Sequence, residues 1–225
     1  MSKAIILLSG GLDSTTTLAI AKSKGYECYA LSINYHQRHI SELEAAKKIA
    51  IYYEVKDHKI IEIDLSWMTN SALTNFDLNI PTELTPYIPI TYVPVRNTLM
   101  LTLALGWAEV IGAHDIFIGV NAVDFSGYPD CRPEYIEQFQ KMANLATKTG
   151  IEGQIIEFHT PLIRLSKEEI ITLGIKLGVD YSLTISCYQS NILGMACGVC
   201  DSCMLRKRGF AMLKIADPTK YQLKL

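Results

Sequence analysis

The sequence lacks the features that mark membrane proteins, exported proteins and proteins that coat nucleic acid. Its longest apolar stretch, TLMLTLALGWA (98–108), has about half the length of a bilayer-spanning helix and predicts a buried helix instead. The earlier run AIILL (4–8) is too short for the core of a signal peptide. The net charge is only −2 at pH 7. We therefore expect a soluble cytoplasmic protein with no membrane partner, and nucleic acid as an unlikely one.

Cysteine is scarce along most of the chain and concentrated near its end. Four of the six cysteines share one short segment, and these are Cys187, Cys197, Cys200 and Cys203. Disulfide frameworks usually spread their cysteines through a smaller chain, so a metal site is the better interpretation. Four thiolates can close a tetrahedral Zn²⁺ site and leave no open position, which predicts a structural role. A [4Fe–4S] cluster is the alternative.

Short apolar runs alternate with longer segments of helical pattern. Strands are predicted at 4–8, 28–33, 59–65, 115–120 and 154–162. Helices are predicted at 14–24, 41–54, 97–112, 133–149, 167–177 and 201–211. Ser41–Glu44 and Ser166–Glu169 have the spacing of a capping box and mark two helix starts. The alternation predicts an α/β fold, a parallel sheet with helices on both faces.

Residues 66–95 break this alternation, because they contain four prolines and no clear period. Such an irregular insertion is more typical of a lid or a binding loop than of a passive connection. We expect residues 1–180 to form one domain that carries this insertion. Residues 181–225 are expected to form a metal-binding segment packed on that domain.

The turn SGGLDS (9–14) follows the first predicted strand and opens a helix. Gly10 and Gly11 let backbone N–H groups converge on an anion, and the helix start adds its partial positive charge. The hydroxyls of Ser9, Ser14 and Thr15 are further donors. Asp13 would repel a phosphate unless Mg²⁺ bridges the two, so the turn predicts a site for magnesium and a nucleotide phosphate. A tight turn in which Asp13 and Ser14 only cap the helix is the alternative.

Three cations lie at or near the predicted ligand edge. Arg96 stands at a helix start, where a cation opposes the helix dipole, and this indicates a neighbouring anion. Arg38, in YHQRH (35–39), and Lys167 are also placed to contact phosphate. An exposed surface position is the alternative for Arg96 and for Lys167.

The loop after the fourth strand is rich in polar and aromatic residues. Asp124 and Asp130 could accept hydrogen bonds from a guanidine-like pair of N–H groups, and Tyr128 could stack on a flat ring. Ser126 is a further candidate for substrate contact. The same loop could instead be a set of turns in which Asp130 caps the next helix. After the cysteines, the short basic run at 206–208 could contact an RNA backbone, but such runs are more often solvated helix ends.

The SGGLDS turn resembles the PP-loop of the ATP-pyrophosphatase superfamily, which binds the pyrophosphate of ATP. Four motifs follow it in a fixed order: YHQRH, YVPVRN, DFSGYPDCRPEY and the cysteine cluster. In that order they are similar to the 7-cyano-7-deazaguanine synthase family of the queuosine pathway, from residue 4 to residue 210. The resemblance implies a Rossmann-like domain of the adenine nucleotide alpha hydrolase type, a structural zinc on the four cysteines, and a homodimer.

The same resemblance implies the reaction: 7-carboxy-7-deazaguanine, ammonia and ATP with Mg²⁺ give the nitrile. It places ATP on Leu8, Ser9, Gly10, Gly11, Leu12, Asp13, Ser14, Thr15, Thr16, Thr17 and Leu18. At two positions this chain departs from the family, which commonly has glycine where His36 and Val95 stand. Those departures bear on the shape of two loops rather than on the type of reaction.

The chemistry requires activation of the substrate, because ammonia cannot displace oxide from a carboxylate. Adenylation would supply AMP as the leaving group and lead to an amide, and a second activation of the amide oxygen would give the nitrile. ADP and phosphate are the alternative products. The alternative functions are a PP-loop enzyme that thiolates tRNA, a zinc-bearing RNA-binding module and an iron–sulfur redox protein.

Overall fold

The computed structural model describes residues 1–38, 40–83, 87–121 and 127–223. Its centre is a five-stranded sheet with the strand order β3-β2-β1-β4-β5, and every neighbouring pair is parallel. The strands are β1 (Lys3–Leu7), β2 (Glu27–Asn34), β3 (Asp57–Glu62), β4 (Asp115–Phe117) and β5 (Glu157–His159). The predicted parallel sheet is confirmed, although β4 and β5 are shorter than the apolar runs suggested.

The strand order explains why β1 is so apolar. It is the middle strand, with β2 on one side and β4 on the other, and helices cover both of its faces. Ala4, Ile5 and Ile6 are accordingly inaccessible to solvent. The edge strand β3 has a largely exposed pattern instead. Parallel sheets buried on both faces are built from such continuous apolar strands.

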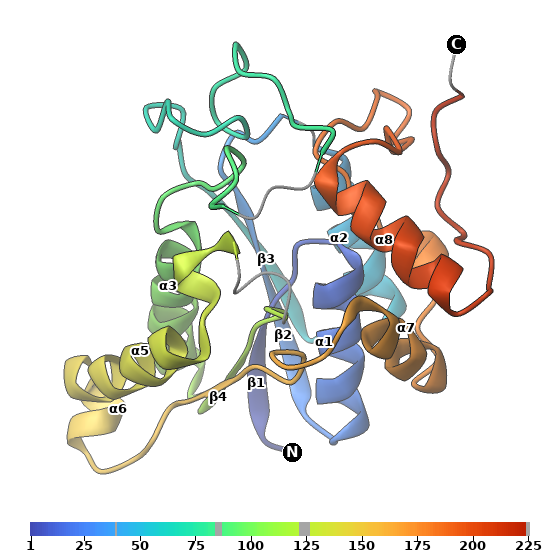
Figure 1. Cartoon of the computed structure of the whole chain (residues 1–225). Helices are drawn as coiled ribbons and strands as arrows, with labels where there is room; N and C mark the ends of the chain where they lie inside the picture. The colour runs from blue at the N-terminus through green and yellow to red at the C-terminus, as the bar shows by residue number, and fades with distance from the viewer. Residues whose placement is uncertain (39, 84–86, 122–126, 224–225) are drawn as a thin grey trace.

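Helices form a layer on each side of the sheet (Figure 1). The helices are α1 (Leu12–Ser23), α2 (Ser41–Tyr52), α3 (Arg96–Ile111), α5 (Pro133–Ala146), α6 (Lys148–Ile151), α7 (Lys167–Lys176) and α8 (Asp201–Met212). Two short 3₁₀ turns, η1 (Pro129–Cys131) and η2 (Tyr181–Leu183), complete the elements. In the view of Figure 1, α3, α5 and α6 lie on one side of the sheet and α1, α7 and α8 on the other. None of the helices in the described ranges combines the length and the apolar character needed to cross a membrane.

The two predicted capping boxes have different outcomes. At α7 the prediction is confirmed, because the Ser166 hydroxyl accepts from the N–H of Glu169 and the Glu169 carboxylate accepts from the N–H of Ser166. At α2 it is wrong, since Ile40 occupies the capping position without a side-chain hydrogen bond. The hydroxyl of Ser41 instead lies 2.8 Å from that of Ser190, in the segment that carries the cysteines.

The sheet order reverses between β1 and β4, and ligands of doubly wound folds bind beyond the carboxyl ends of the strands at such a point. The glycine turn leaves β1 at this end. The described parts of the insertion (66–83 and 87–95) contain no helix or strand and lie above the same end of the sheet (Figure 1). The fold therefore brings the turn and the insertion to one edge.

Candidate active site

The glycine turn needs a residue without a side chain at position 10. Gly10 has a φ of +87°, which side-chain-bearing residues rarely adopt. A Cβ atom added there would lie 2.1 Å from the carbonyl oxygen of Glu42 and 2.7 Å from the nitrogen of Ala46. Gly10 therefore allows the first turn of α2 to pack directly against the loop. Gly11, the next residue, is the N-terminal cap of α1.

Hydroxyl groups hold the loop in shape. The Ser14 Oγ accepts from the N–H of Ser9 at 3.2 Å and donates to the carbonyl of Gly11 at 3.1 Å. The N–H of Leu12, at the start of α1, donates to the Ser186 Oγ at 3.1 Å. Ser9, Ser14 and Ser186 all line one cavity at the positive end of α1, a position that favours an anion.

Asp13 is paired with Lys167 at the entrance to this cavity. The Lys167 Nζ lies 2.8 Å and 2.7 Å from the two carboxylate oxygens, and both side chains are largely buried. Asn121 donates to the same carboxylate at 3.4 Å. The sequence places Asp13 and Lys167 far apart, and the structure joins them. A cation bound between Asp13 and a phosphate would compete with this pair for the carboxylate.

A cavity of about 450 Å³ extends from the glycine turn toward α2 and α3. Part of its wall is apolar and suits a flat ring, and this part consists of Leu7, Leu31, Ile33, Met100, Ile118 and Val120. Tyr128 lines the cavity, and its hydroxyl is 3.1 Å from that of Thr91 in the insertion. The insertion therefore forms part of the cavity wall.

A second part of the cavity wall, at the starts of α2 and α3, carries two opposite charges. The Arg96 Nη1 donates to the Tyr35 hydroxyl at 3.3 Å, and its Nε is buried and has no hydrogen-bond partner in the described chain. The Glu42 side chain lines the same wall and forms no hydrogen bond or ion pair with any described residue. Burial raises the pKa of the Glu42 carboxyl to about 7, although Arg96 opposes that shift.

The predicted nucleotide residues divide into two groups. Those that line the cavity are Leu8, Ser9, Gly11, Leu12, Asp13 and Ser14, together with Arg96, Tyr128 and Lys167. The others lie behind the loop and shape it, and these are Gly10, Thr15, Thr16, Thr17 and Leu18. Thr16, for example, is buried with its Oγ1 2.8 Å from the Tyr181 hydroxyl. Asp124 and Ser126 lie outside the described residues.

The sequence predicts that Arg38 contacts phosphate, but in the structure it binds backbone carbonyls of the insertion. Its Nε donates to the carbonyl of Ala72 at 2.7 Å, and its Nη2 donates to the carbonyls of Asn75 and Leu78. Arg38 is absent from the cavity wall. It ties the loop after β2 to the insertion, and the motif alone did not distinguish that role from anion binding.

Asp130 likewise lies away from the cavity wall. It is 4% exposed, and its Oδ2 accepts from the backbone N–H of Asn97 at 2.9 Å, in the first turn of α3. It therefore caps a helix, as the alternative interpretation supposed, but the helix is α3 rather than the following one. Its carboxylate helps to fix Arg96, the residue before Asn97.

Both departures from the family's glycines fall on left-handed backbone. His36 has a φ of +60° and Val95 a φ of +50°. Glycine adopts this conformation freely, whereas valine adopts it only under strain. Val95 directly precedes Arg96 as the N-terminal cap of α3, and the His36 Nε2 is 3.1 Å from a carboxylate oxygen of Glu62. The unusual residues thus keep the conformation that glycine would supply.

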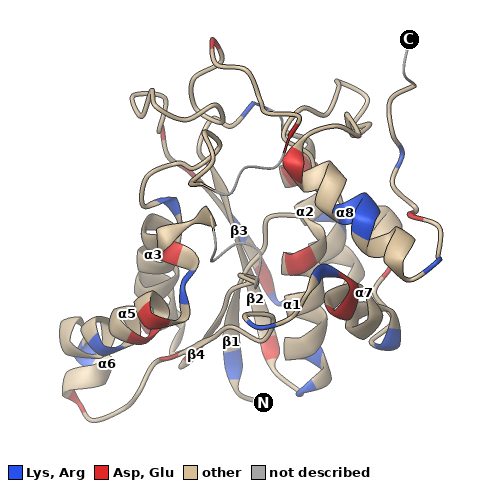
Figure 2. Cartoon of the chain, viewed as in Figure 1, with Lys and Arg blue, Asp and Glu red and all other residues tan. Residues whose placement is uncertain are grey.

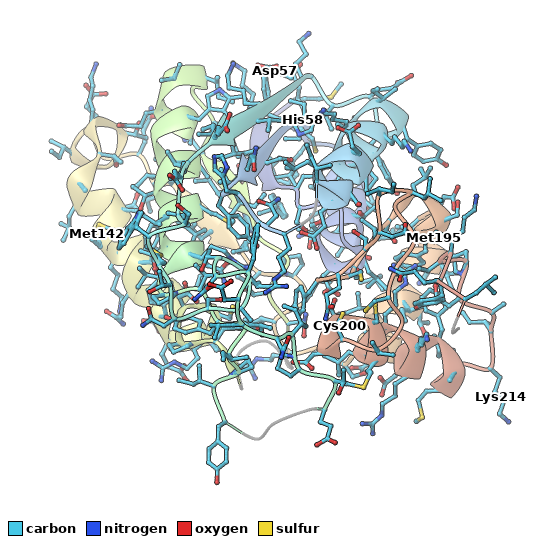
Figure 3. The ribbon with its side chains drawn as sticks, turned by 90° about the horizontal axis from the view of Figure 1, so that it is seen from above. Asp57, His58, Met142, Met195, Cys200 and Lys214 are labelled. Atoms are coloured by element: carbon cyan, nitrogen blue, oxygen red, sulfur yellow. The ribbon has the colours of Figure 1, made fainter. Side chains whose placement is uncertain are left out.

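The four clustered cysteines meet at one point, as predicted. The sulfur atoms of Cys187, Cys197, Cys200 and Cys203 all lie within 4.8 Å of one another. Backbone N–H groups donate to two of these sulfurs; for example, the N–H of Cys197 is 3.1 Å from the Cys187 Sγ. Tetrahedral thiolates at about 2.3 Å from one ion have sulfur atoms about 3.8 Å apart. The cluster can therefore hold a single metal ion, and Figure 3 shows Cys200 beside α8.

The cysteine segment also supports the glycine turn directly. The N–H of Ile185 donates to the carbonyl of Gly10 at 3.0 Å, and Ser186 accepts from the start of α1. Both residues come immediately before Cys187. A metal ion that fixes this segment would therefore also fix the loop.

Two residues of the basic run after the cysteines make contacts within the chain, whereas the third, Arg208, is exposed. Arg206 is 2% exposed and binds the Asp217 carboxylate and the Thr184 hydroxyl. Lys207 donates to the carbonyl of Gly198 at 2.9 Å and lies over the Tyr221 ring. Figure 2 shows the acidic start of α8 and one short basic stretch further along it. Arg206 and Lys207 therefore stabilise the C-terminal segment, which leaves Arg208 as the exposed cation of the run.

Several cavity residues had no signal in the sequence. Glu42, Ser186 and Tyr188 all line the cavity, but none belongs to a recognisable pattern. Glu42 follows a serine at a helix start, where an acidic residue is expected for the helix alone. Its place in the cavity depends on the close contact between α2 and Gly10.

Comparison with known proteins gives a consistent set of similarities. The family model described as "Queuosine biosynthesis protein QueC" matches residues 3–214. A 7-cyano-7-deazaguanine synthase from Nitrosospira multiformis is 61% identical over 222 residues, covering 98% of this chain and 96% of its own. One from Dechloromonas aromatica is 60% identical and covers 99% of both chains. The solved NMN synthetase of Francisella tularensis has a TM-score of 0.52 at 16% identity, covers 96% of this chain and 78% of its own, and shares the fold.

Proposed function

The chain belongs to the QueC family of queuosine biosynthesis proteins, and we propose that it is an ATP-dependent ligase that makes 7-cyano-7-deazaguanine from 7-carboxy-7-deazaguanine and ammonia. The observation that carries this proposal is the cavity that joins a PP-loop turn to Arg96, whose buried Nε has no partner among the described residues. One end suits a nucleotide phosphate and the other suits a carboxylate. Carboxylate activation needs both in one enclosure.

In this proposal the triphosphate lies against Ser9, Gly11 and Ser14, where a helix start and hydroxyl groups converge. Lys167 would leave Asp13 and contact phosphate oxygens. Bound Mg²⁺ would neutralise phosphate charge and shield Asp13 from it. The pairing of Asp13 with Lys167 supports this arrangement, because Asp13 already holds one cation and could exchange it for Mg²⁺.

The substrate carboxylate is assigned to Arg96 and the ring to the neighbourhood of Tyr128. Arg96 offers a buried Nε donor without a partner, and a guanidinium suits a carboxylate. Tyr128 lines the cavity, and its ring centroid lies 5.9 Å from that of Tyr92, which is outside the lining. Replacing Arg96 with Lys should raise the KM for the carboxylic acid far more than the KM for ATP.

The metal in the cysteine cluster is proposed to be zinc. The spacing of the four sulfur atoms suits one tetrahedral ion, whereas an iron–sulfur cube places its own atoms between the thiolates and separates them further. Its function is structural, because four protein ligands leave no position for water. Elemental analysis of the purified protein tests this directly: one zinc per chain is expected, and a brown iron-containing protein would contradict it.

ATP as a substrate supports the expected cytoplasmic location. The homodimer is also kept as a proposal. Ile192 and Leu193, in the loop between two cysteine ligands, are fully or largely exposed, and such apolar surface is common at subunit interfaces. Light scattering at micromolar concentration should give twice the 25.1 kDa chain mass.

The decisive assay supplies 7-carboxy-7-deazaguanine, ammonium, ATP and Mg²⁺ to the purified protein. Formation of the nitrile together with AMP and pyrophosphate is expected. ADP without AMP would contradict adenylation while leaving the ligase function intact. Absence of the nitrile would contradict the function itself.

A further inference from the structure

Of the acidic residues that line the cavity in the described chain, Asp13 pairs with Lys167 and Asp201 starts α8, whereas Glu42 has no established task. It is the second residue of α2, whose carbonyl oxygen touches the glycine turn. The side chain faces the cavity and makes no hydrogen bond or ion pair within the described ranges. Glu44, two residues further along α2, shows the usual environment of a helical glutamate. Its carboxylate is exposed and lies 2.7 Å from the Lys47 Nζ.

Glu42 is half-buried, and a carboxylate that loses part of its hydration without gaining a partner costs free energy, so its position requires an explanation. Arg96, in the same part of the wall, acts on it electrostatically without forming an ion pair. The other titratable groups that act with it are Tyr35, after β2, and Cys200, at the start of α8. Burial and Cys200 raise the pKa of Glu42 to about 7, and Arg96 limits that rise. The group can thus take up and release a proton near neutral pH.

The proposed reaction needs such a group at the nitrogen atom. Ammonia is present mainly as ammonium near pH 7 and has no lone pair until it loses a proton. The nitrogen of the amide must then lose its remaining protons as the C≡N bond forms. Adenylation does not require a base at that point.

We propose, on the basis of the proposed function, that Glu42 is the catalytic base that removes protons from the nitrogen that becomes the nitrile nitrogen. In the first round, ammonium gives one proton to Glu42 and the freed lone pair forms the C–N bond at the activated carboxyl carbon. The C–O bond to the phosphoryl group breaks, and its electron pair leaves on the phosphate oxygen, which takes the second proton. The amide keeps two protons.

In the second round, activation of the amide oxygen leaves a nitrogen that carries two protons and a positive charge. One proton passes to Glu42 and the other to the departing phosphate, while the C–O electron pair leaves with that phosphate and the C≡N bond is completed. Glu42 returns its proton to solvent after each round. One carboxylate serves both rounds because the nitrogen stays on the same carbon.

The test separates activation from nitrogen chemistry. Glu42→Gln keeps the shape of the side chain and removes its basicity, and Glu44→Gln on the same helix is the matched control. Exchange of labelled pyrophosphate into ATP, with the carboxylic acid and without ammonia, should stay within about 3-fold of wild type in both variants. Nitrile formation from ammonium at pH 7 should fall between about 10²- and 10⁴-fold in Glu42→Gln alone.

The pH profile gives a second readout that a structural role would not change. Wild-type nitrile formation should rise to a plateau through a pKa near 7, whereas Glu42→Gln should rise in proportion to free ammonia without that inflection. Glu42→Asp keeps a carboxylate and should retain the inflection with a smaller loss. If Glu42→Gln fails to fold, Glu42→Asp still tests whether a carboxylate at this position sets the pH profile.

Three results would overturn the proposal. These are a wild-type nitrile rate in Glu42→Gln, a parallel loss of pyrophosphate exchange, or an inflection that persists in that variant. Wild-type protein that makes no nitrile in the same assay would refute the proposed function instead. The two failures are therefore distinguishable.

Discussion

The two sides of the cavity hold their polar groups in opposite ways. On the glycine-turn side, Asp13 is paired with Lys167, and Ser9 with Ser14. On the α2–α3 side, the Glu42 carboxylate has no partner in the described chain, and the Arg96 Nε has none either. The first side must exchange partners when a charged ligand arrives. The second side holds the Glu42 carboxylate and the Arg96 Nε ready to interact with a ligand that has lost its hydration shell.

The largest effect is expected on the paired side. Asp13→Ala should reduce turnover at least about 10³-fold, because it removes the carboxylate that pairs with Lys167 and is assigned to magnesium. Circular dichroism should show a folded protein. Asp57→Ala is the matched control, since Asp57 is exposed and pairs only with Lys59 on the edge strand β3. Unchanged turnover in Asp13→Ala would remove this residue from the site.

A comparison of two glycines separates the cost of a steric clash in the turn from the cost of backbone strain. Gly10 and Gly25 have nearly the same φ, +87° and +82°. An added Cβ meets the carbonyl of Glu42 at position 10 and no atom within 4 Å at position 25. Gly25→Ala should therefore cost about 1–2 kcal/mol of unfolding free energy, the strain alone. Gly10→Ala should cost several kcal/mol, measured by urea unfolding, and equal losses would contradict the close contact.

The cysteine cluster should affect the glycine-turn side more than the opposite one. Cys200→Ser is expected to lower metal content and melting temperature together, because metal binding is coupled to folding. ATP affinity should fall as well, since Ile185 and Ser186 connect the cluster to the turn. Cys28→Ser, a buried cysteine far from the cluster, should keep the metal. Full metal content in Cys200→Ser would contradict the assignment.

The smallest effect is a change in how stability depends on pH. The pKa of Glu42 is raised from an ordinary glutamate value to about 7, so its stabilising effect is complete below about pH 4 and is lost as the pH rises through 7. Glu42→Gln lacks this loss and should gain up to about 3 kcal/mol over wild type between pH 5 and pH 8. Thermal melts at both pH values measure it. If the stability difference between Glu42→Gln and wild type were the same at both pH values, the raised pKa of Glu42 would be contradicted. The control Glu44→Gln should show no change in the pH dependence of stability.

The sequence predicted what local chemistry determines. The turn at 9–14, the parallel sheet and the meeting of four cysteines all follow from short motifs or from periodic patterns. The wall that contains Glu42 could not be predicted, because it arises from the contact of α2 with a turn thirty residues earlier. Arg38 and Arg96 show the same limit. Arg38 lies in the loop after β2 and Arg96 starts α3, and only the tertiary structure separates the one bound to carbonyls from the one whose Nε has no partner among the described residues.

The most direct test of the account is a crystal structure with Mg²⁺, a non-hydrolysable ATP analogue and 7-carboxy-7-deazaguanine. The account predicts the triphosphate at Ser9–Ser14, the Asp13–Lys167 pair opened, and the substrate carboxylate near Arg96 with Glu42 within reach of the attacking nitrogen's position. A nucleotide bound elsewhere, with Asp13 and Lys167 still paired, would contradict it.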